Sequence, residues 1–263
     1  MAAPSRPEFR EWVDKQPDPA WTLMPLTHIC KALVGNDIAR IGRIEPTDCE
    51  ILGSSVAYFF YGRPAYRTSG DGPIKNPAAC PMCFVFDPRL IEEATEIHPF
   101  DTGAYTARLY SHIFMDEMKR EDFSLESQSR RPNRLINTVY GTREAYFDGN
   151  RAKISTTAAA PADFLAYTYI ELLRSTSRNE PDDRVGTIEI VCGESVPLAG
   201  NLLATVVPDI IWNDQDKSEW LSKLQALNVT ILPFRYLHGR DPEHHHAMIE
   251  IEIRNFYESR GDI

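Results

Sequence analysis

Residues 56–67 read VAYFFYGRPAYR, and this stretch constrains the fold more than any other part of the chain. Its first six residues are β-branched, aromatic or small, and a glycine and a proline close the run, so we expect a strand over 56–61. Arg63 and Tyr66 follow directly. Because polar groups are costly to bury without partners, this placement predicts that the strand borders a polar site.

Two other strand-like stretches carry polar residues among apolar ones. The first opens with Thr27 and His28, and in the second Glu189 stands between two isoleucines. Successive side chains of a strand point to opposite faces, so Glu189 faces either solvent or a cleft, away from both neighbours. We expect the three stretches to converge on one polar cleft.

The rest of the chain predicts helices and strands without regular alternation. Residues 26–35 are expected to form a strand entering a short helix that stops at Gly35. Further helices are expected at 8–13, 105–119, 132–139, 162–173 and 220–227, and further strands at 84–86, 187–192, 204–207, 229–232 and 248–253. This mixture favours an α+β domain over a doubly wound parallel sheet. Residues 1–20 are expected to form an arm, and residues 21–263 a single domain.

Asp101 and Thr102 follow a turn-rich segment that begins at His98. Either residue of the pair can cap a helix that starts there. The alternative is that His98 or Asp101 lines the mouth of the cleft and touches a substrate.

The 263 residues carry a net charge of −10, which argues against binding of nucleic acid or anionic membranes by the surface as a whole. There is no apolar signal core and no bilayer-spanning run, so we expect a cytoplasmic protein that does not bind membranes. One segment is basic, in contrast to the negative charge of the whole chain, and its basic residues are interleaved with aromatic ones. It contains Arg130, Arg131, Arg134, Arg143, Arg151 and Lys153, with Tyr140, Tyr146 and Phe147. It is interpreted as a nucleic-acid surface or as helix faces with ion pairs to Glu144 and Asp148.

No metal site is expected. Cys80 and Cys83 form a single CxxC without two further ligands at a suitable spacing, and five scattered cysteines indicate reduced thiols. The adjacent histidines 244–246 cannot all face one ion, and the preceding Asp-Pro predicts that they lie in a loop. Phosphate-binding loops, dinucleotide fingerprints, serine elbows and zinc helices are also absent from the sequence.

The Thr-His-Ile opening, the strand ending in Gly-Arg-Pro and the Ile-Glu-Ile strand, taken in that order, resemble the ADP-ribosyltransferase fold. They are similar to the DarT-type nucleic-acid ADP-ribosyltransferase toxins. The resemblance covers about the first 70 residues and residues 184–210. It implies a split β-sandwich of two small sheets around an NAD cleft, with flanking helices and without metal.

The resemblance also implies roles for individual residues. Glu189 would bind the nicotinamide ribose and stabilise its developing charge, and Arg63 would contact the NAD phosphates or the acceptor. His28 would hold the ribose or the edge of the nicotinamide, and Tyr66 would stack on the nicotinamide ring. Thr27 and Tyr58 are placed among the other residues that contact NAD.

The function implied is transfer of ADP-ribose from NAD to a macromolecule, such as a DNA or RNA base, by a toxin or antiviral defence enzyme restrained by an antitoxin protein. The chemistry suits these residue types, because a carboxylate stabilises an oxocarbenium-like transition state. Two alternatives stay open: an NAD glycohydrolase, and a catalytically inert module that binds a nucleotide or a partner.

Overall fold

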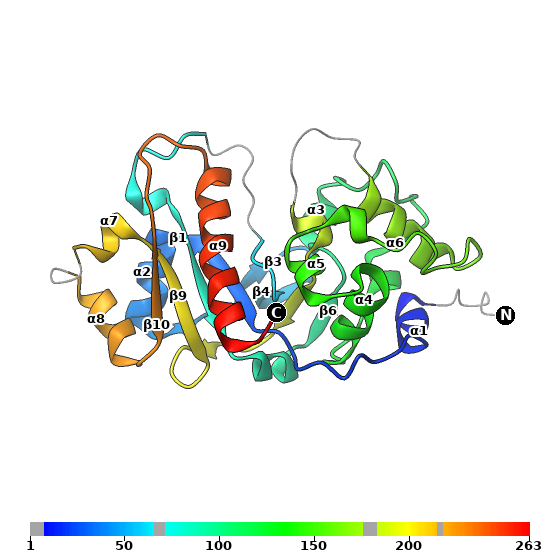
Figure 1. Cartoon of the computed structure of the whole chain (residues 1–263), viewed down its shortest axis with the longest axis horizontal. Coiled ribbons are helices and arrows are strands. Elements are labelled where there is room, and N and C mark those ends of the chain that lie inside the picture. The colour runs from blue at the N-terminus through cyan, green and yellow to red at the C-terminus, as the bar shows by residue number, and fades with distance from the viewer. Residues whose placement is uncertain (1–7, 66–71, 176–182, 215–217) are drawn as a thin grey trace.

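The computed structural model describes residues 8–65, 72–175, 183–214 and 218–263. These residues form a mixed α+β structure, as predicted, with a large mixed sheet and a second, two-stranded sheet. The second sheet pairs β2 (Arg43–Ile44) with β8 (Val196–Pro197). Figure 1 shows two groups of helices, one at each end of the large sheet.

The large sheet has the strand order β10-β9-β5-β1-β4-β7-β6, with β3 paired to β4. Neighbouring strands of this sheet are antiparallel, except for the parallel pair β9 and β10. The strands are β1 (Leu26–Lys31), β3 (Thr47–Cys49), β4 (Ser54–Tyr61), β5 (Pro81–Phe86), β6 (Glu96–His98), β7 (Glu189–Cys192), β9 (Leu202–Pro208) and β10 (Thr230–Phe234).

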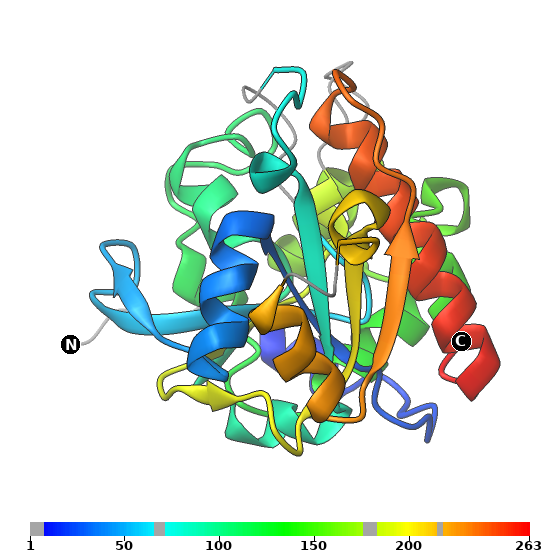
Figure 2. The same ribbon diagram turned by 90° about the vertical axis from the view of Figure 1, so that its left-hand side faces the viewer.

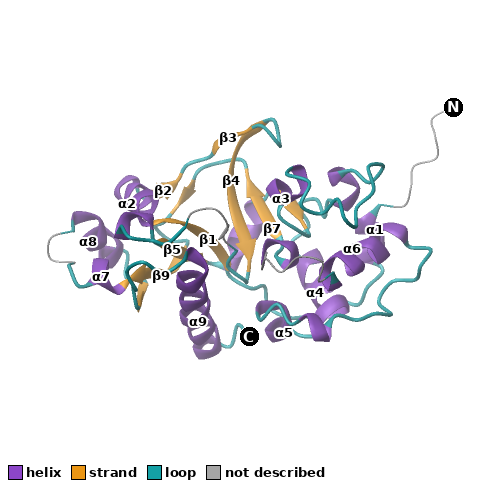
Figure 3. Cartoon of the chain, turned by 90° about the horizontal axis from the view of Figure 1, so that it is seen from above, coloured by secondary structure: helices purple, strands orange, loops and turns teal. Residues whose placement is uncertain are grey.

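The sheet opens between β1 and β4. All six residues of β1 pair with β5, but only Leu26 and Thr27 pair with β4. In Figure 3, β5 and β9 lie on one side of β1, and β4 and β7 lie on the other. Two small sheets were expected, but the described residues form one large sheet here, whose two parts are joined at Leu26 and Thr27.

The helices cover this sheet in two groups. In Figure 2, α2 and α8 lie on one side of β5, β9 and β10, while α9 lies on the other. The α-helices are α1 (Phe9–Asp14), α2 (Ala32–Ile41), α3 (Thr102–Thr106), α4 (Arg131–Tyr140), α5 (Arg143–Phe147), α6 (Phe164–Arg174), α7 (Asp209–Trp212), α8 (Glu219–Ala226) and α9 (Pro242–Arg260). Short 3-10 turns lie at Pro77–Ala79, Pro88–Glu93, Arg120–Phe123, Arg151–Lys153 and Asp183–Gly186.

Most of the predicted elements are confirmed: α1, α4, α6 and α8 among the helices, and β1, β4, β5, β7, β9 and β10 among the strands. Within the segment 1–20, α1 buries Phe9, Trp12 and Val13 and packs against α4 and α6.

The predicted stop at Gly35 is wrong. Helix α2 continues to Ile41 and ends at Gly42, whose φ of +82° is a left-handed conformation that favours glycine. Gly35 has a packing role instead, because a Cβ there would lie 2.1 Å from Sδ of the buried Met82.

Two further predictions are also wrong. The helix expected at 105–119 does not form, because α3 ends at Thr106 and Arg108 adopts a φ of 57°. The following aromatic side chains, Tyr110 and Phe114, gather around Phe100 instead. The strand expected at 248–253 belongs to α9. Its alternating apolar residues imitate a strand, but Pro242 starts a helix that continues to Arg260 and is capped by Gly261. Histidines 244–246 therefore lie in this helix and not in a loop.

Candidate functional site

Glu189 is the first residue of β7 and lies between two other strands. It pairs with Phe60 of β4 and with His98 of β6, so these three side chains share one face of the sheet. The residue is 3% exposed. Glu189 therefore does not face solvent, which was one of the two orientations left open by its sequence pattern.

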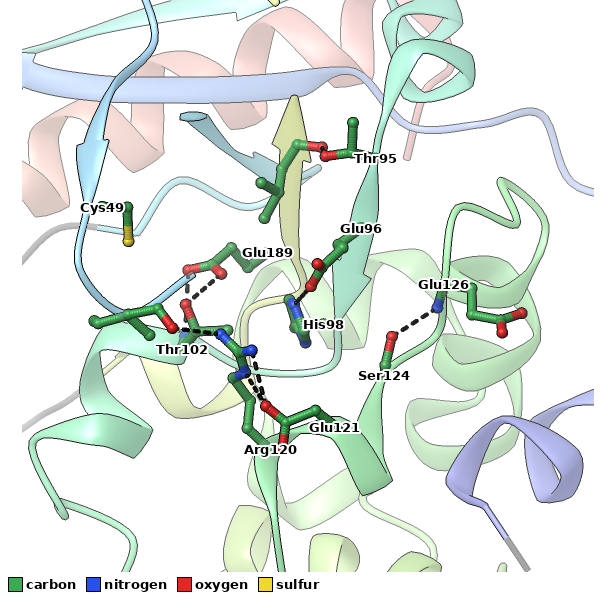
Figure 4. Close-up of polar contacts among 12 residues, drawn as sticks. Cys49, Thr95, Glu96, His98, Thr102, Arg120, Glu121, Ser124, Glu126 and Glu189 are labelled. Atoms are coloured by element: carbon green, nitrogen blue, oxygen red, sulfur yellow. Dashed lines mark hydrogen bonds and ion pairs between the residues drawn. The ribbon is translucent and has the colours of Figure 1, made fainter. Parts of the chain in front are cut away.

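The carboxyl group of Glu189 is held by the start of α3 (Figure 4). The Thr102 hydroxyl donates to Oε1 over 2.8 Å, and the Thr102 amide donates to Oε2 over 3.3 Å. Thr102 is placed by Asp101, whose side chain caps α3 by accepting from the Ala104 amide at 2.6 Å. The capping interpretation of this segment is thus confirmed, and the same turn positions Glu189.

The environment of Glu189 favours a bound proton. Burial, and then the charge of Asp101, raise the pKa of Glu189 to about 8, although the hydrogen bonds from Thr102 act in the opposite direction. At neutral pH the carboxyl is therefore mostly protonated. A positive charge placed beside it would favour the ionised form.

Tyr58 and Cys49 lie on the same face. Tyr58 is two residues from Phe60 on β4, and its hydroxyl lies 2.6 Å from Cys49 Sγ. Burial, the contact with Cys49 and the charge of Glu189 raise the pKa of Tyr58 well above its usual value. Burial raises the pKa of the Cys49 thiol, but the hydrogen bonds made by this thiol lower it by more, so the net shift is downward.

His28 and Thr27 lie where β1 and β4 separate. His28 Nδ1 is 2.8 Å from the Tyr58 carbonyl, and the ring lies against Phe59. A carbonyl can only accept, so Nδ1 carries the proton and Nε2 of the neutral ring is an acceptor. Burial lowers the pKa of His28, which favours this neutral form. The Thr27 hydroxyl lies 3.3 Å from the carbonyl oxygens of both Phe60 and Arg63.

Arg63 is directed away from this group. Its side chain is 8% exposed, and Nε lies 3.5 Å from Glu250 Oε1 on α9. With Tyr140, Gly149 and Gly186, it lines a cavity of about 30 Å³. The structure thus places Thr27, His28, Tyr58 and Glu189 on adjoining strands. Thr27, Tyr58 and Glu189 share one face, whereas the His28 ring lies against Phe59, whose side chain alternates with those of Tyr58 and Phe60. The Arg63 guanidinium is not brought together with any of them. Tyr66 lies outside the described residues.

Two polar residues near Glu189 are His98 and Arg120. From the sequence, Arg120 was given no role, and His98 was given only the alternative role of lining the mouth of the cleft. His98 is 1% exposed, and its Nε2 lies 2.8 Å from Glu96 Oε2, which lowers the pKa of Glu96. Arg120 lies nearby, with Nη1 donating to the Ile51 carbonyl over 3.2 Å (Figure 4). The spacing Glu-x-His was the sequence signal for the contact between Glu96 and His98, because residues two apart in a strand point to the same face.

The basic segment forms ion pairs, although with other partners than expected. Arg130 pairs with Asp18, and Arg131 pairs with Asp14. Tyr140, Tyr146 and Phe147 are buried and cannot stack on bases in this conformation. Nucleic-acid binding stays a prediction. Arg151 and Lys153 are the basic residues of this segment that are exposed and can contact phosphates without a change of conformation.

Within the described residues no cluster of three His, Cys, Asp or Glu side chains could hold a metal ion. In the same part of the chain, no helix is long and apolar enough to span a membrane. Comparisons with protein-family models, curated proteins and solved structures give no match for this chain.

Proposed function

We propose that the protein is an ADP-ribosyltransferase that moves ADP-ribose from NAD to a macromolecular acceptor, and that the opening between β1 and β4 belongs to a split NAD-binding fold. One observation carries the proposal. The buried carboxyl of Glu189 lies on β7, next to β4, and His28 lies on β1, on the other side of β4, where β1 and β4 separate.

The proposed reaction breaks the bond between the nicotinamide nitrogen and ribose C1. Its electron pair neutralises the nicotinamide, and positive charge develops on the ribose. An ionised Glu189 beside the ribose would stabilise that charge more in the transition state than in the ground state. The cationic nicotinamide ribose would itself favour loss of the proton that Glu189 holds. The acceptor then bonds to C1 and releases a proton to solvent.

Other residues would position NAD. The neutral His28 ring offers Nε2 as an acceptor for a ribose hydroxyl, while its Nδ1 stays bound to the Tyr58 carbonyl. Tyr66 is proposed to stack on the nicotinamide. Arg63 can reach the phosphates only by leaving Glu250, so its role in binding NAD requires a rearrangement of that side chain.

A DNA or RNA base is the proposed acceptor. Exposed Arg151, which also lines the Arg63 cavity, and exposed Lys153 would attract a phosphate backbone to this side of the protein. An enzyme that modifies nucleic acid endangers its own cell, so we also propose a defence or toxin role under the control of an antitoxin protein.

Incubation with NAD labelled in the adenylate, together with DNA, RNA or protein, tests the proposal. We expect label on nucleic acid and release of nicotinamide, both abolished by Glu189→Gln and retained by Glu194→Gln, an exposed control just after the same strand. Free ADP-ribose without transfer would identify a glycohydrolase instead. NAD binding without nicotinamide release would identify an inert module.

A further inference from the structure

A large groove lies between α1 and α6, which are neighbours at one end of the molecule (Figure 1). It has a volume of about 530 Å³ and shares none of its lining residues with the Glu189 site. Phe9 and Trp12 of α1 are buried beneath it, and Met115 and Phe164 stand at it with 56% and 71% of their surface exposed. Volumes of this size accommodate several large side chains or one small molecule.

The exposed apolar residues are not scattered singly. Met115 and Phe164 border one concave surface whose floor is aromatic, and such exposed apolar patches mark interaction sites more often than isolated residues do. Methionine adapts its shape to different partners, which suits docking.

The charges at the groove indicate which partner it accepts. Glu11, Glu117 and Asp163 are exposed there, and Lys15 is the exposed basic residue among the lining residues. Glu8 also lines the groove and forms an ion pair with Arg10. The rim is therefore acidic around an apolar floor, which complements a segment with apolar side chains flanked by lysine or arginine.

We propose that this groove docks a basic amphipathic segment, most readily a helix, of a partner protein. A helix would lay its apolar face between α1 and α6 and place its basic residues beside Glu11, Glu117 and Asp163. The interaction is independent of the NAD chemistry proposed above.

Fluorescence anisotropy with a labelled helical peptide of leucine and lysine tests this. Because the chain carries a net charge of −10, any cationic peptide is attracted to it, and the test must separate docking from that attraction. Phe164→Asp does so: it makes the groove more acidic while it removes the apolar anchor. Ile251→Asp, at a 51% exposed position of α9, adds the same charge elsewhere.

Docking in the groove predicts that Phe164→Asp weakens binding by about tenfold or more, while Ile251→Asp leaves it unchanged. Asp163→Lys should weaken binding of this peptide and strengthen binding of a matched leucine and glutamate peptide. Unfolding temperatures confirm that each variant is folded. Unchanged or tighter binding by Phe164→Asp would overturn the proposal. Self-association of the protein that Phe164→Asp abolishes would also overturn it, since the occupant would then be a second copy.

Discussion

The Thr102 hydroxyl donates to the Glu189 carboxyl over 2.8 Å and joins the first residue of α3 to the first residue of β7 across 87 positions of sequence. The bond lowers the pKa of a carboxyl that burial and Asp101 otherwise raise. Thr102→Val should therefore move the pKa of Glu189 higher still and destabilise the fold by about 1–3 kcal/mol, through a buried group left without its partner. Chemical denaturation measures the loss. Thr106→Val, at an exposed position of α3, is the control. Equal losses in both variants would show that the contact contributes nothing.

Glu189 should make the stability of the protein depend on pH. Its pKa is about 8 in the folded protein and near 4.5 in the unfolded chain, so the folded state binds the proton more tightly. The resulting stabilisation is complete below pH 4.5 and is lost as the pH rises to about 8, at up to about 1.4 kcal/mol per pH unit.

Glu189→Gln cannot ionise and should remove this dependence. The unfolding temperature of the variant relative to the wild type should therefore rise between pH 4.5 and pH 8. Parallel curves for the two proteins over that range would mean that Glu189 is not the buried acid described here.

Gly35→Ala should destabilise the protein although alanine favours helices by about 1 kcal/mol. The new Cβ would lie 2.1 Å from Met82 Sδ in the core, and overpacking of this kind costs about 1–3 kcal/mol. Urea denaturation of Gly35→Ala, Met82→Ala and the double variant measures the coupling between the two sites. We expect the double variant to be more stable than the sum of the single losses predicts, and strict additivity would rule out the contact.

The ion pair of Arg63 with Glu250 anchors α9 to the end of β4. Glu250→Gln removes a carboxylate charge beside a nearly buried guanidinium, so it should lower stability by roughly 1–3 kcal/mol. Glu252→Gln, on the same helix, serves as the control. A loss of similar size in both variants, measured by thermal unfolding, would mean that the pair does not anchor the helix.

Strands β4 and β7 could be predicted because their local pattern agrees with their tertiary role, whereas the short β3 and β6 were not predicted. The β-branched and aromatic run of β4 is closed by Gly62, and Glu189 interrupts an apolar strand, so both were found from local sequence. By contrast, the alternation of Ile and Glu near residue 250 imitates a strand. In the helix α9, which packs against β5 and β10, Ile249 and Ile253 are buried while Ile251 is exposed.

The surroundings of Glu189 could not be predicted, because they depend on contacts between distant residues. Sequence placed Thr102 at a helix start, but nothing local indicates that its hydroxyl reaches β7. The shortness of α3 is likewise set by the left-handed backbone at Arg108, a residue type that gives no signal for that conformation. Arg63 was found as a polar residue at a strand end, but its partner lies on a helix that was read as a strand.

The pH dependence of nicotinamide release from NAD tests the central claim most directly. Since kcat/KM reports the free enzyme and the proposed reaction needs an ionised Glu189, kcat/KM should rise with pH and level off above about 8. Glu189→Gln should lower it by about a hundredfold or more and leave the residual rate independent of pH. Release at the wild-type rate by Glu189→Gln, or a wild-type rate that falls as the pH rises toward 8, would contradict the assignment of this carboxyl to NAD cleavage.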